Sequence, residues 1–174
     1  MQNITIRRAT FEDAAEIANV HINSWREAYK GLLPGDFLDE RPLAFKNRYE
    51  LWKKVTVNIS QVTFVAESRD HGVVGFINGK NGRDEDLLDH AEVWCIYLLK
   101  KYHGQKIGFN LLKAFFDTQS DLGFKKGYLW VLANNPTIAF YEKTGGKFSG
   151  RTKEDNIGGN KVEEQCFFWE SIDL

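Results

Sequence analysis

The chain has 174 residues and a mass of 20.0 kDa, which is long enough for one well-buried domain and short for two, so we expect a single domain over residues 1–174. Its formal net charge is -1, and this near balance of charges argues against nucleic acid or an anionic membrane surface as the main partner. No apolar run approaches the roughly 18 residues of a membrane span, and the N-terminus lacks the residue order of a signal peptide, which favours a cytoplasmic protein.

The two cysteines also favour a cytoplasmic protein. Cys95 and Cys166 lie in apolar, strand-like runs and lack the spacing of metal ligands. Buried free thiols are therefore favoured over a disulfide or a zinc site, and they fit a reducing compartment. We expect no metal.

A strand and a long helix are predicted at the start of the chain. Ile4 to Ala9 alternates apolar and polar residues, as a half-buried strand does. Thr10 then heads the sequence T-F-E-D, so a helix is predicted to begin at Phe11 and to end at Gly31, before the break L-L-P-G. A second, shorter helical region is expected around the aromatic residues Phe37, Phe45, Tyr49 and Trp52.

Strands dominate the rest of the chain. Val62–Ser68 and Gly72–Gly79 are predicted to form a hairpin, and an acidic loop from Arg83 to Asp89 separates them from a buried strand over Val93–Leu99. Apolar residues at helical spacing follow from Ile107. The remaining predicted elements are a strand at Lys126–Leu132, a short helix at Pro136–Lys143 and a closing pair of strands at Lys147–Arg151 and Glu163–Trp169. This order predicts an α/β fold with a mixed, mostly antiparallel central sheet flanked by helices.

The turn between the buried strand and the next helix is a candidate phosphate site. It comprises Leu98 to Gly108, with the sequence L-L-K-K-Y-H-G-Q-K-I-G. The first N–H groups of a helix have no intrahelical partners and carry the positive end of the helix dipole, so the turn can present several donors to a pyrophosphate. An ordinary strand-to-helix connection is the alternative. The turn lacks the G-K-[ST] ending of a P-loop, which disfavours a phosphotransferase of that class.

Three separated segments together resemble the Gcn5-related N-acetyltransferases (GNAT family). They are the opening strand with its T-F-E-D helix, the run from Glu92 to Gly108, and N-N-P-T-I-A-F-Y-E-K at Asn134 to Lys143. Within the family, W-R-E-A-Y-K-G-L-L-P at Trp25 to Pro34 and the tail E-D-N-I-G-G are similar to a branch of small bacterial-type enzymes. The resemblance implies acetyl-CoA as co-substrate and a GNAT-like acyl-CoA-binding fold.

The resemblance also implies which residues bind the cofactor. The family signature at the turn is Arg or Gln, two residues, Gly, one residue, then Gly or Ala, and the aligned residues here are His103, Lys106 and Gly108. Two of the three depart from it, and Lys106 adds a side chain where the backbone approaches the pyrophosphate, but also a charge that can reach a phosphate. The cofactor-binding residues implied are the main chain of Ile96 and Leu98, the turn residues His103, Gly104, Gln105, Lys106, Ile107 and Gly108, and Asn134.

Two catalytic residues follow from the resemblance. Tyr141 matches the family tyrosine near the CoA sulfur, and a phenol with a pKa of about 10 can protonate a thiolate with a pKa of about 8.5 at a cost of about 2 kcal/mol. Glu92 lies where several members carry a glutamate that accepts the amine proton. Its alternative role is that of a solvated edge residue, and His90 could replace or assist it. The alternative for Tyr141 is a core aromatic that packs on the sheet. The alternative for Asn134 is a plain turn residue.

The predicted function is transfer of acetyl from acetyl-CoA to a primary amine of a polyamine-like small molecule or a peptide, by direct attack. The alternative is a non-catalytic acyl-CoA-binding module, which the altered turn signature favours. The acidic loop could attract a cationic acceptor, although such loops are more often simply solvated. Trp25 and Tyr29 match residues that line the acceptor site in the family, or they pack beneath the sheet. Since dimers are frequent in the family, a homodimer is an alternative to a monomer.

Overall fold

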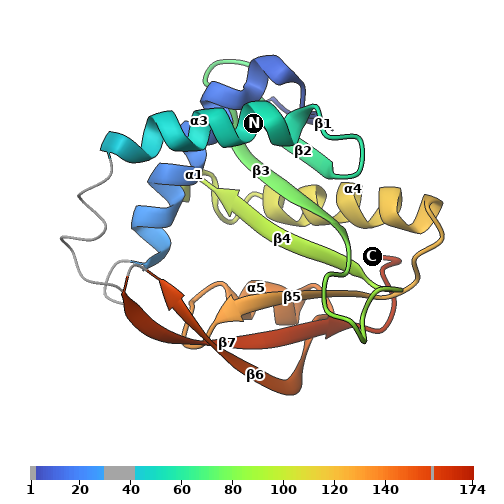
Figure 1. Cartoon of the computed structure of the whole chain (residues 1–174). Helices are drawn as coiled ribbons and strands as arrows, with labels where there is room; N and C mark the ends of the chain where they lie inside the picture. The colour runs from blue at the N-terminus through green and yellow to red at the C-terminus, as the bar shows by residue number, and fades with distance from the viewer. Residues whose placement is uncertain (1–2, 30–41, 158) are drawn as a thin grey trace.

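The computed structural model describes residues 3–29, 42–157 and 159–174, which form a mixed sheet of seven strands covered by helices (Figure 1). The strands lie in the order β1-β2-β3-β4-β5-β7-β6, and every neighbouring pair is antiparallel except β4 and β5. The expected mixed, mostly antiparallel sheet is therefore confirmed. The strand bounds are β1 Ile4–Arg8, β2 Val62–Ser68, β3 Gly72–Asn81, β4 Ala91–Leu98, β5 Gly127–Leu132, β6 Lys147–Ile157 and β7 Asn160–Trp169.

Helices cover both faces of this sheet. Adjacent residues of a strand point to opposite faces, and in β3 Phe76 packs with α1 and α3 whereas Ile77 packs with α4. The larger cluster, on the α4 and α5 face, also contains Leu111 and Trp169. The helix bounds are α1 Ala14–Tyr29, α3 Pro42–Thr56, α4 Ile107–Asp121 and α5 Ile138–Lys143, with two 3-10 turns, η1 Phe11–Asp13 and η2 Lys100–Tyr102.

The start of α1 is fixed by the T-F-E-D sequence, as predicted, although η1 precedes the α-helix. The Asp13 carboxylate accepts a hydrogen bond from the Thr10 backbone N–H at 2.7 Å. Arg7 donates to both oxygens of Asp13 at 2.7 and 2.8 Å and to Glu67 at 2.7 Å. Because Arg7 lies on β1 and Glu67 on β2, these ion pairs connect the helix start to the edge of the sheet.

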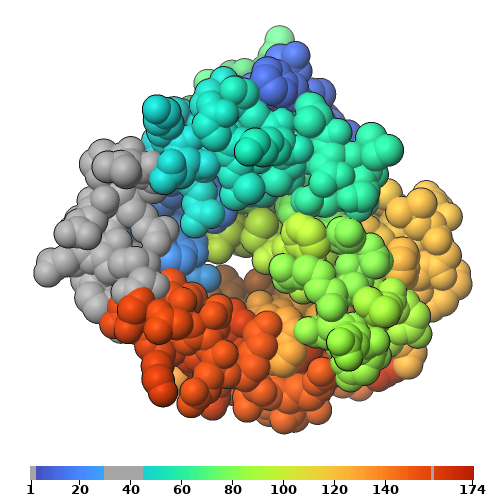
Figure 2. Space-filling model, viewed as in Figure 1, coloured from blue at the N-terminus to red at the C-terminus, as the bar shows by residue number. Residues whose placement is uncertain are grey.

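The parallel pair of β4 and β5 ends after three residues, where Ala91 to Val93 lie opposite Gly127 to Leu129. The register between β3 and β4 shifts at the same point, and Trp94 is the extra residue of a β-bulge. A bulge bends the strand and increases its twist, so the rest of β4 turns away from β5. Figure 1 shows the two strands diverging, and Figure 2 shows a hollow between β4, β5 and α1.

The predicted elements are present with some shifted bounds. β3 continues to Asn81, α5 begins only at Ile138, and β6 extends to Ile157 rather than ending at Arg151. The extra length of β6 is mostly exposed and charged, so it carries no apolar alternation in the sequence. The predicted helix end at Gly31, the break after it and Phe37 lie outside the described residues.

Two further expectations concern the cysteines and the helices. Cys95 and Cys166 are both free, as expected, and burial raises the pKa of each thiol to about 12. Within the described ranges, no helix combines the length and apolar content needed to cross a membrane. The same residues contain no group of three or more His, Cys, Asp or Glu side chains arranged to hold a metal ion.

Candidate active site

Side chains on the two faces of β4 lie on different sides of the hollow. Ile96 and Leu98 pack into the cluster on the α4 side, while Cys95 and Tyr97 pack into the cluster on the α1 and α3 side. The side chains of Ile96 and Leu98 are therefore held in the core. Because the pairing of β4 with β5 ends at Val93, the β5-facing edge of β4 beyond that residue is open to a ligand's amide groups.

The turn after β4 leads directly into the N-terminus of α4. Lys106 is the N-cap of this helix and has a φ of 61°, a left-handed conformation that glycine adopts without strain. Gly104 also has a positive φ, of 76°. The family glycine is thus replaced by a lysine that keeps the glycine-like backbone. The first N–H groups of the 15-residue helix can then serve an anion.

The side chains of His103 and Gln105 contact backbone carbonyl groups within the turn. A ring nitrogen of His103, Nε2, lies 2.9 Å from the Leu98 carbonyl oxygen, and Gln105 donates to the Lys101 carbonyl at 3.3 Å. The carbonyl oxygen of Leu98, a main-chain group predicted to bind the cofactor, is thus already within hydrogen-bond distance of the His103 ring. Beside the turn lies an open cavity of about 400 Å³, lined by Asn23, Arg26, Glu27, Leu99, Lys100 and Lys101.

The segment from Asn134 to Lys143 brings Tyr141 beneath the sheet. Asn134 lies in the turn two residues after the end of β5 and has a φ of 65°. The Asn135 side chain then accepts hydrogen bonds from the Thr137 N–H at 2.9 Å and hydroxyl at 2.7 Å, which sets the start of α5. The ring of Tyr141 packs edge-on against Trp169 at 6.1 Å.

Tyr141 is buried, with 6% of its surface exposed. Burial raises its pKa above the ordinary value of 10, and a hydrogen bond with Thr137 lowers it in part. The nearby groups that raise it further are Tyr29 and Cys95. Tyr141 therefore lies within electrostatic reach of α1, which carries Tyr29, and of β4, which carries Cys95.

The Glu92 carboxylate is buried, and both of its oxygens accept hydrogen bonds. Its Oε1 accepts from the Arg83 guanidinium at 2.6 Å, and its Oε2 accepts from Arg83 Nε at 2.9 Å and from the Arg83 backbone N–H at 3.0 Å. The solvated edge role is excluded, since only 3% of its side chain is exposed. His90 precedes the first residue of β4, so it does not share the face of Glu92, and its ring contacts Asp89 and Phe168.

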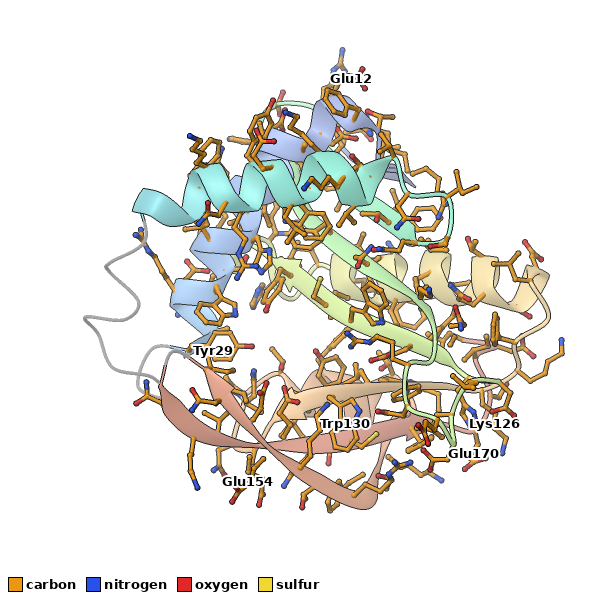
Figure 3. The ribbon with its side chains drawn as sticks, viewed as in Figure 1. Glu12, Tyr29, Lys126, Trp130, Glu154 and Glu170 are labelled. Carbon is orange, nitrogen blue, oxygen red and sulfur yellow. The ribbon has the colours of Figure 1, made fainter. Side chains whose placement is uncertain are left out.

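A hydrogen bond and an ion pair attach the acidic loop to strands of the sheet. Asp84 accepts a hydrogen bond from the Trp130 indole at 2.9 Å, and Asp86 pairs with Arg151 at 2.9 Å. Lys153 lies 4.1 Å above the same Trp130 ring. Figure 3 labels Trp130 on β5. These carboxylates therefore already have cationic or indole partners.

Aromatic side chains of α1 and β4 gather beside the hollow, and the sequence pattern did not single out the one on β4, Tyr97. Trp25 and Tyr29 have ring centroids 4.6 Å apart, and Tyr29 accepts hydrogen bonds from Trp25 and Tyr97. Burial raises the pKa of both tyrosines. Glu164 of β7 also acts electrostatically on Tyr29, which Figure 3 places at the end of α1 near the β6–β7 hairpin.

The comparison with known families settles the class of this fold. The model of the acetyltransferase (GNAT) family matches residues 22–146, more than half of the chain. The chain belongs to the GNAT family. An uncharacterized N-acetyltransferase of Bacillus subtilis (strain 168), YuaI, is 32% identical over 171 residues, which are 97% of this chain and 94% of that protein.

Other GNAT relatives agree. A spermidine N(1)-acetyltransferase of Thermoplasma acidophilum is 25% identical over 164 residues, 92% of this chain and 99% of that protein. The crystal structure of the PaiA N-acetyltransferase from Thermoplasma acidophilum in complex with coenzyme A has a TM-score of 0.72 at 25% identity and covers 93% of this chain and 98% of that chain. This GNAT chain is accordingly an acetyl-CoA-dependent N-acetyltransferase, with acetyl-CoA as its co-substrate, and not a non-catalytic module.

Sequence reasoning missed two residues that contact predicted site residues, Tyr97 beside Tyr29 and Arg83 beside Glu92. Tyr97 could have been found, because in β4 it alternates with Ile96 and Leu98 and must face the other way. Arg83 gave no signal, since it lies in a charged loop. Its pairing with Glu92 depends on tertiary contacts.

Proposed function

We propose that this GNAT enzyme transfers acetyl to a primary amine of a small molecule or a peptide, by direct attack and without a covalent enzyme intermediate. The observation that carries the proposal is the divergence of β4 from β5 after Val93. It connects the N-terminus of α4, where an anion fits, with the aromatic wall of Tyr29 and Tyr97. The spermidine acetyltransferase relative supports an amine acceptor, and polyamine-like amines are one candidate class.

For the cofactor, we propose that the main chain of Ile96 and Leu98 binds the amide arm and that the turn binds the pyrophosphate. Lys106 offers an exposed ammonium group beside the helix N-terminus. The positive end of the helix dipole and this charge favour the same anion. Asn134 is proposed to flank the arm from the end of β5. The turn residues of the proposal are His103, Gly104, Gln105, Lys106, Ile107 and Gly108.

Acetyl-CoA supplies the acetyl group as a thioester, which an uncharged amine can attack. A new C–N bond forms, the C–S bond breaks, and the sulfur departs with the electron pair. An ammonium acceptor thus yields the amide, the CoA thiol and one free proton. We assign Tyr141 to protonating the sulfur: burial keeps its phenol protonated at neutral pH, although the raised pKa makes this transfer cost more than the about 2 kcal/mol of an unperturbed phenol. Glu92 is the proposed acceptor of the amine proton, and its pairing with Arg83 implies that the proton arrives through water.

We also propose that residues 1–174 act as one domain, because strands from Ile4 to Trp169 form a single sheet. The free thiols of Cys95 and Cys166 support a reducing, cytoplasmic location. A homodimer stays a prediction that gel filtration with light scattering can check.

The function is tested by measuring CoA thiol release from acetyl-CoA with a panel of amines. The panel contains spermidine, putrescine, lysine, simple alkylamines and short peptides with free N-termini. Thiol release that requires an amine, with the acetylated amine identified by mass spectrometry, is the expected result. Release at the same rate without any amine would contradict amine transfer.

A further inference from the structure

Lys153 of β6 contacts an aromatic ring and a carboxylate at the same time. Its Nζ lies 4.1 Å from the centre of the Trp130 ring on β5 and 3.3 Å from a carboxylate oxygen of Glu164 on β7. The π face of an indole attracts a cation, and a carboxylate pairs with one. Together, the Trp130 ring and the Glu164 carboxylate have the chemistry to bind one ammonium group, and we call this pair of groups the ammonium site.

The ammonium site lies where β4 and β5 diverge. Pairing between these strands ends at Leu129 of β5, so Trp130 is the first residue of β5 beyond it. Glu164 lies opposite Leu132, the last residue of β5, and its charge acts on Tyr29 at the end of α1. The ammonium site therefore borders the hollow in which acetyl transfer is proposed.

Trp130 and Glu164 are held in place, whereas Lys153 is exposed to solvent. The Trp130 indole N–H donates to Asp84 Oδ2 at 2.9 Å, which fixes the ring and places a negative charge at its edge. Glu164 lies two residues before the buried Cys166, on the face of the sheet opposite α4, and only 17% of its side chain is exposed. The Lys153 side chain is 42% exposed and belongs to the edge strand β6, so its ammonium group regains water when it moves away.

The pair of Lys153 and Glu164 is weak enough for a ligand to replace. The two residues lie directly opposite each other on β6 and β7. A partly exposed ion pair contributes little to stability, because water solvates both charges when they are apart. An ammonium group of a ligand would make the same contacts with the ring and the carboxylate. If the other end of that ligand is already bound in the hollow, its effective concentration at the ammonium site is high.

We propose that the ammonium site binds a second, non-reacting ammonium group of the acceptor, and that Lys153 is an internal stand-in that the acceptor displaces. The preferred acceptor is then a diamine. Its uncharged amino group attacks acetyl-CoA while its protonated far end lies between Trp130 and Glu164. Amines whose far end is a carboxylate are disfavoured, because Glu164 and Asp84 repel it. This inference rests on amine acetylation at the hollow, and it specifies the class of amine and the residues that select it.

The experiment compares amines matched in carbon number, using the full chain and saturating acetyl-CoA. Diaminopropane, putrescine and cadaverine are each assayed beside the alkylamine and the ω-amino acid of equal carbon number. The rate of CoA thiol release is measured. The expected result is a kcat/KM at least about 10-fold higher for one diamine than for its alkylamine, with the amino acid lowest.

Variants then attribute the preference to the ammonium site. E164Q should lower kcat/KM for the preferred diamine about 10-fold more than for its alkylamine, because only the diamine presents a charge to this position. K153M should raise kcat/KM for the diamine by about 3- to 10-fold, since it removes the competing ammonium group and keeps an unbranched side chain. E154Q and K161M are the matched controls, because Glu154 and Lys161 form a fully exposed ion pair, 4.0 Å apart, on the same hairpin. An unchanged CoA affinity verifies that each variant is folded.

Titration calorimetry tests the ammonium site without turnover. Each of the three diamines is titrated into the protein saturated with CoA, whose free thiol has no acetyl group to transfer. For at least one diamine, binding to the parent should be about 10-fold tighter than binding to E164Q. Equal binding of every diamine to the two proteins would contradict the site.

Three kinetic results would also overturn the proposal. They are alkylamines or amino acids that equal or exceed every diamine, an E164Q variant that slows diamine and alkylamine equally, and a K153M variant no faster than the parent or matched by the controls. Failure of the proposed function looks different. In that case no amine of any series accelerates CoA release, while the calorimetric comparison of the parent with E164Q still decides whether the ammonium site exists.

Discussion

Arg83 binds the Glu92 carboxylate through Nη2 at 2.6 Å and Nε at 2.9 Å, while its guanidinium carbon lies 4.5 Å from the centre of the Trp94 ring. Trp94 is the bulge residue at which β4 leaves β5. The β3–β4 loop is thereby attached to the point where the hollow opens.

R83A should destabilise the protein, because it leaves the Glu92 carboxylate buried without its cation. Since 58% of the Arg83 side chain is exposed, water can replace part of the interaction, and we expect a loss of about 1–2 kcal/mol. This corresponds to a melting temperature lower by about 2–8 °C in differential scanning fluorimetry. The double variant R83M/E92Q should regain part of the loss, and strictly additive effects would show that the two residues are not coupled.

Y141F keeps the packing of the ring and removes only the hydroxyl proton. If Tyr141 protonates the departing thiolate, kcat should fall by about 10- to 10,000-fold with nearly unchanged acetyl-CoA affinity. Steady-state kinetics with the best amine measure this. Normal turnover of Y141F would return Tyr141 to the role of a core aromatic.

The raised pKa of Tyr141 has a direct consequence for pH dependence. In the unfolded chain a phenol ionises near pH 10, whereas the folded protein retains the proton to higher pH. The contribution of Tyr141 to stability is therefore complete below about pH 10 and is lost as the pH rises further. Melting curves should show a shallower decline above about pH 10 for Y141F than for the parent, and parallel declines would contradict this.

Lys106 combines a strained backbone with a charge beside the phosphate turn. K106G should relieve the left-handed conformation and raise stability by about 0.5–1 kcal/mol, whereas K106A retains the strain. Both variants should weaken CoA if the ammonium contacts a phosphate, and neither should affect pantetheine analogues that lack phosphate. Titration calorimetry with both ligands checks this, and equal effects on the two would exclude a phosphate contact.

Gly108 lies against α5. A Cβ built at this glycine would be 3.4 Å from the Phe140 ring, an ordinary contact, so G108A should bind CoA almost as the parent does. The larger side chain of G108V should displace α5 or the turn and weaken CoA by tenfold or more, about 1.4 kcal/mol. Unchanged CoA affinity in a folded G108V protein would count against this site.

Cys95 lies on β4, the strand proposed to bind the cofactor, but burial raises the pKa of its thiol to about 12. It is therefore protonated at neutral pH and a poor nucleophile. C95A should retain acetyl transfer within about 3-fold, and intact-protein mass spectrometry with acetyl-CoA alone should detect no acetylated enzyme. An acetyl group on the parent that C95A lacks would instead indicate a covalent route.

Local pattern was sufficient for most of the fold. The alternation in Ile4–Arg8, the T-F-E-D start of α1 and the spacing of Ile107, Leu111 and Phe115 each depend on neighbours within a few residues. The segment from Asn134 to Lys143 and the glycine turn likewise carried the family resemblance, which the family comparison confirmed. These features follow from the sequence because short-range geometry and dihedral preference govern them.

Tertiary structure alone decided the environment of the proposed groups. Glu92 and Arg83 are nine residues apart, yet only the bulge at Trp94 and the folded loop make them a buried pair. Tyr29 and Tyr97 meet because α1 and β4 pack on one face of the sheet. Burial, charge pairing and the divergence of two strands arise from long-range packing, and one-dimensional periodicity contains no information about the resulting distances.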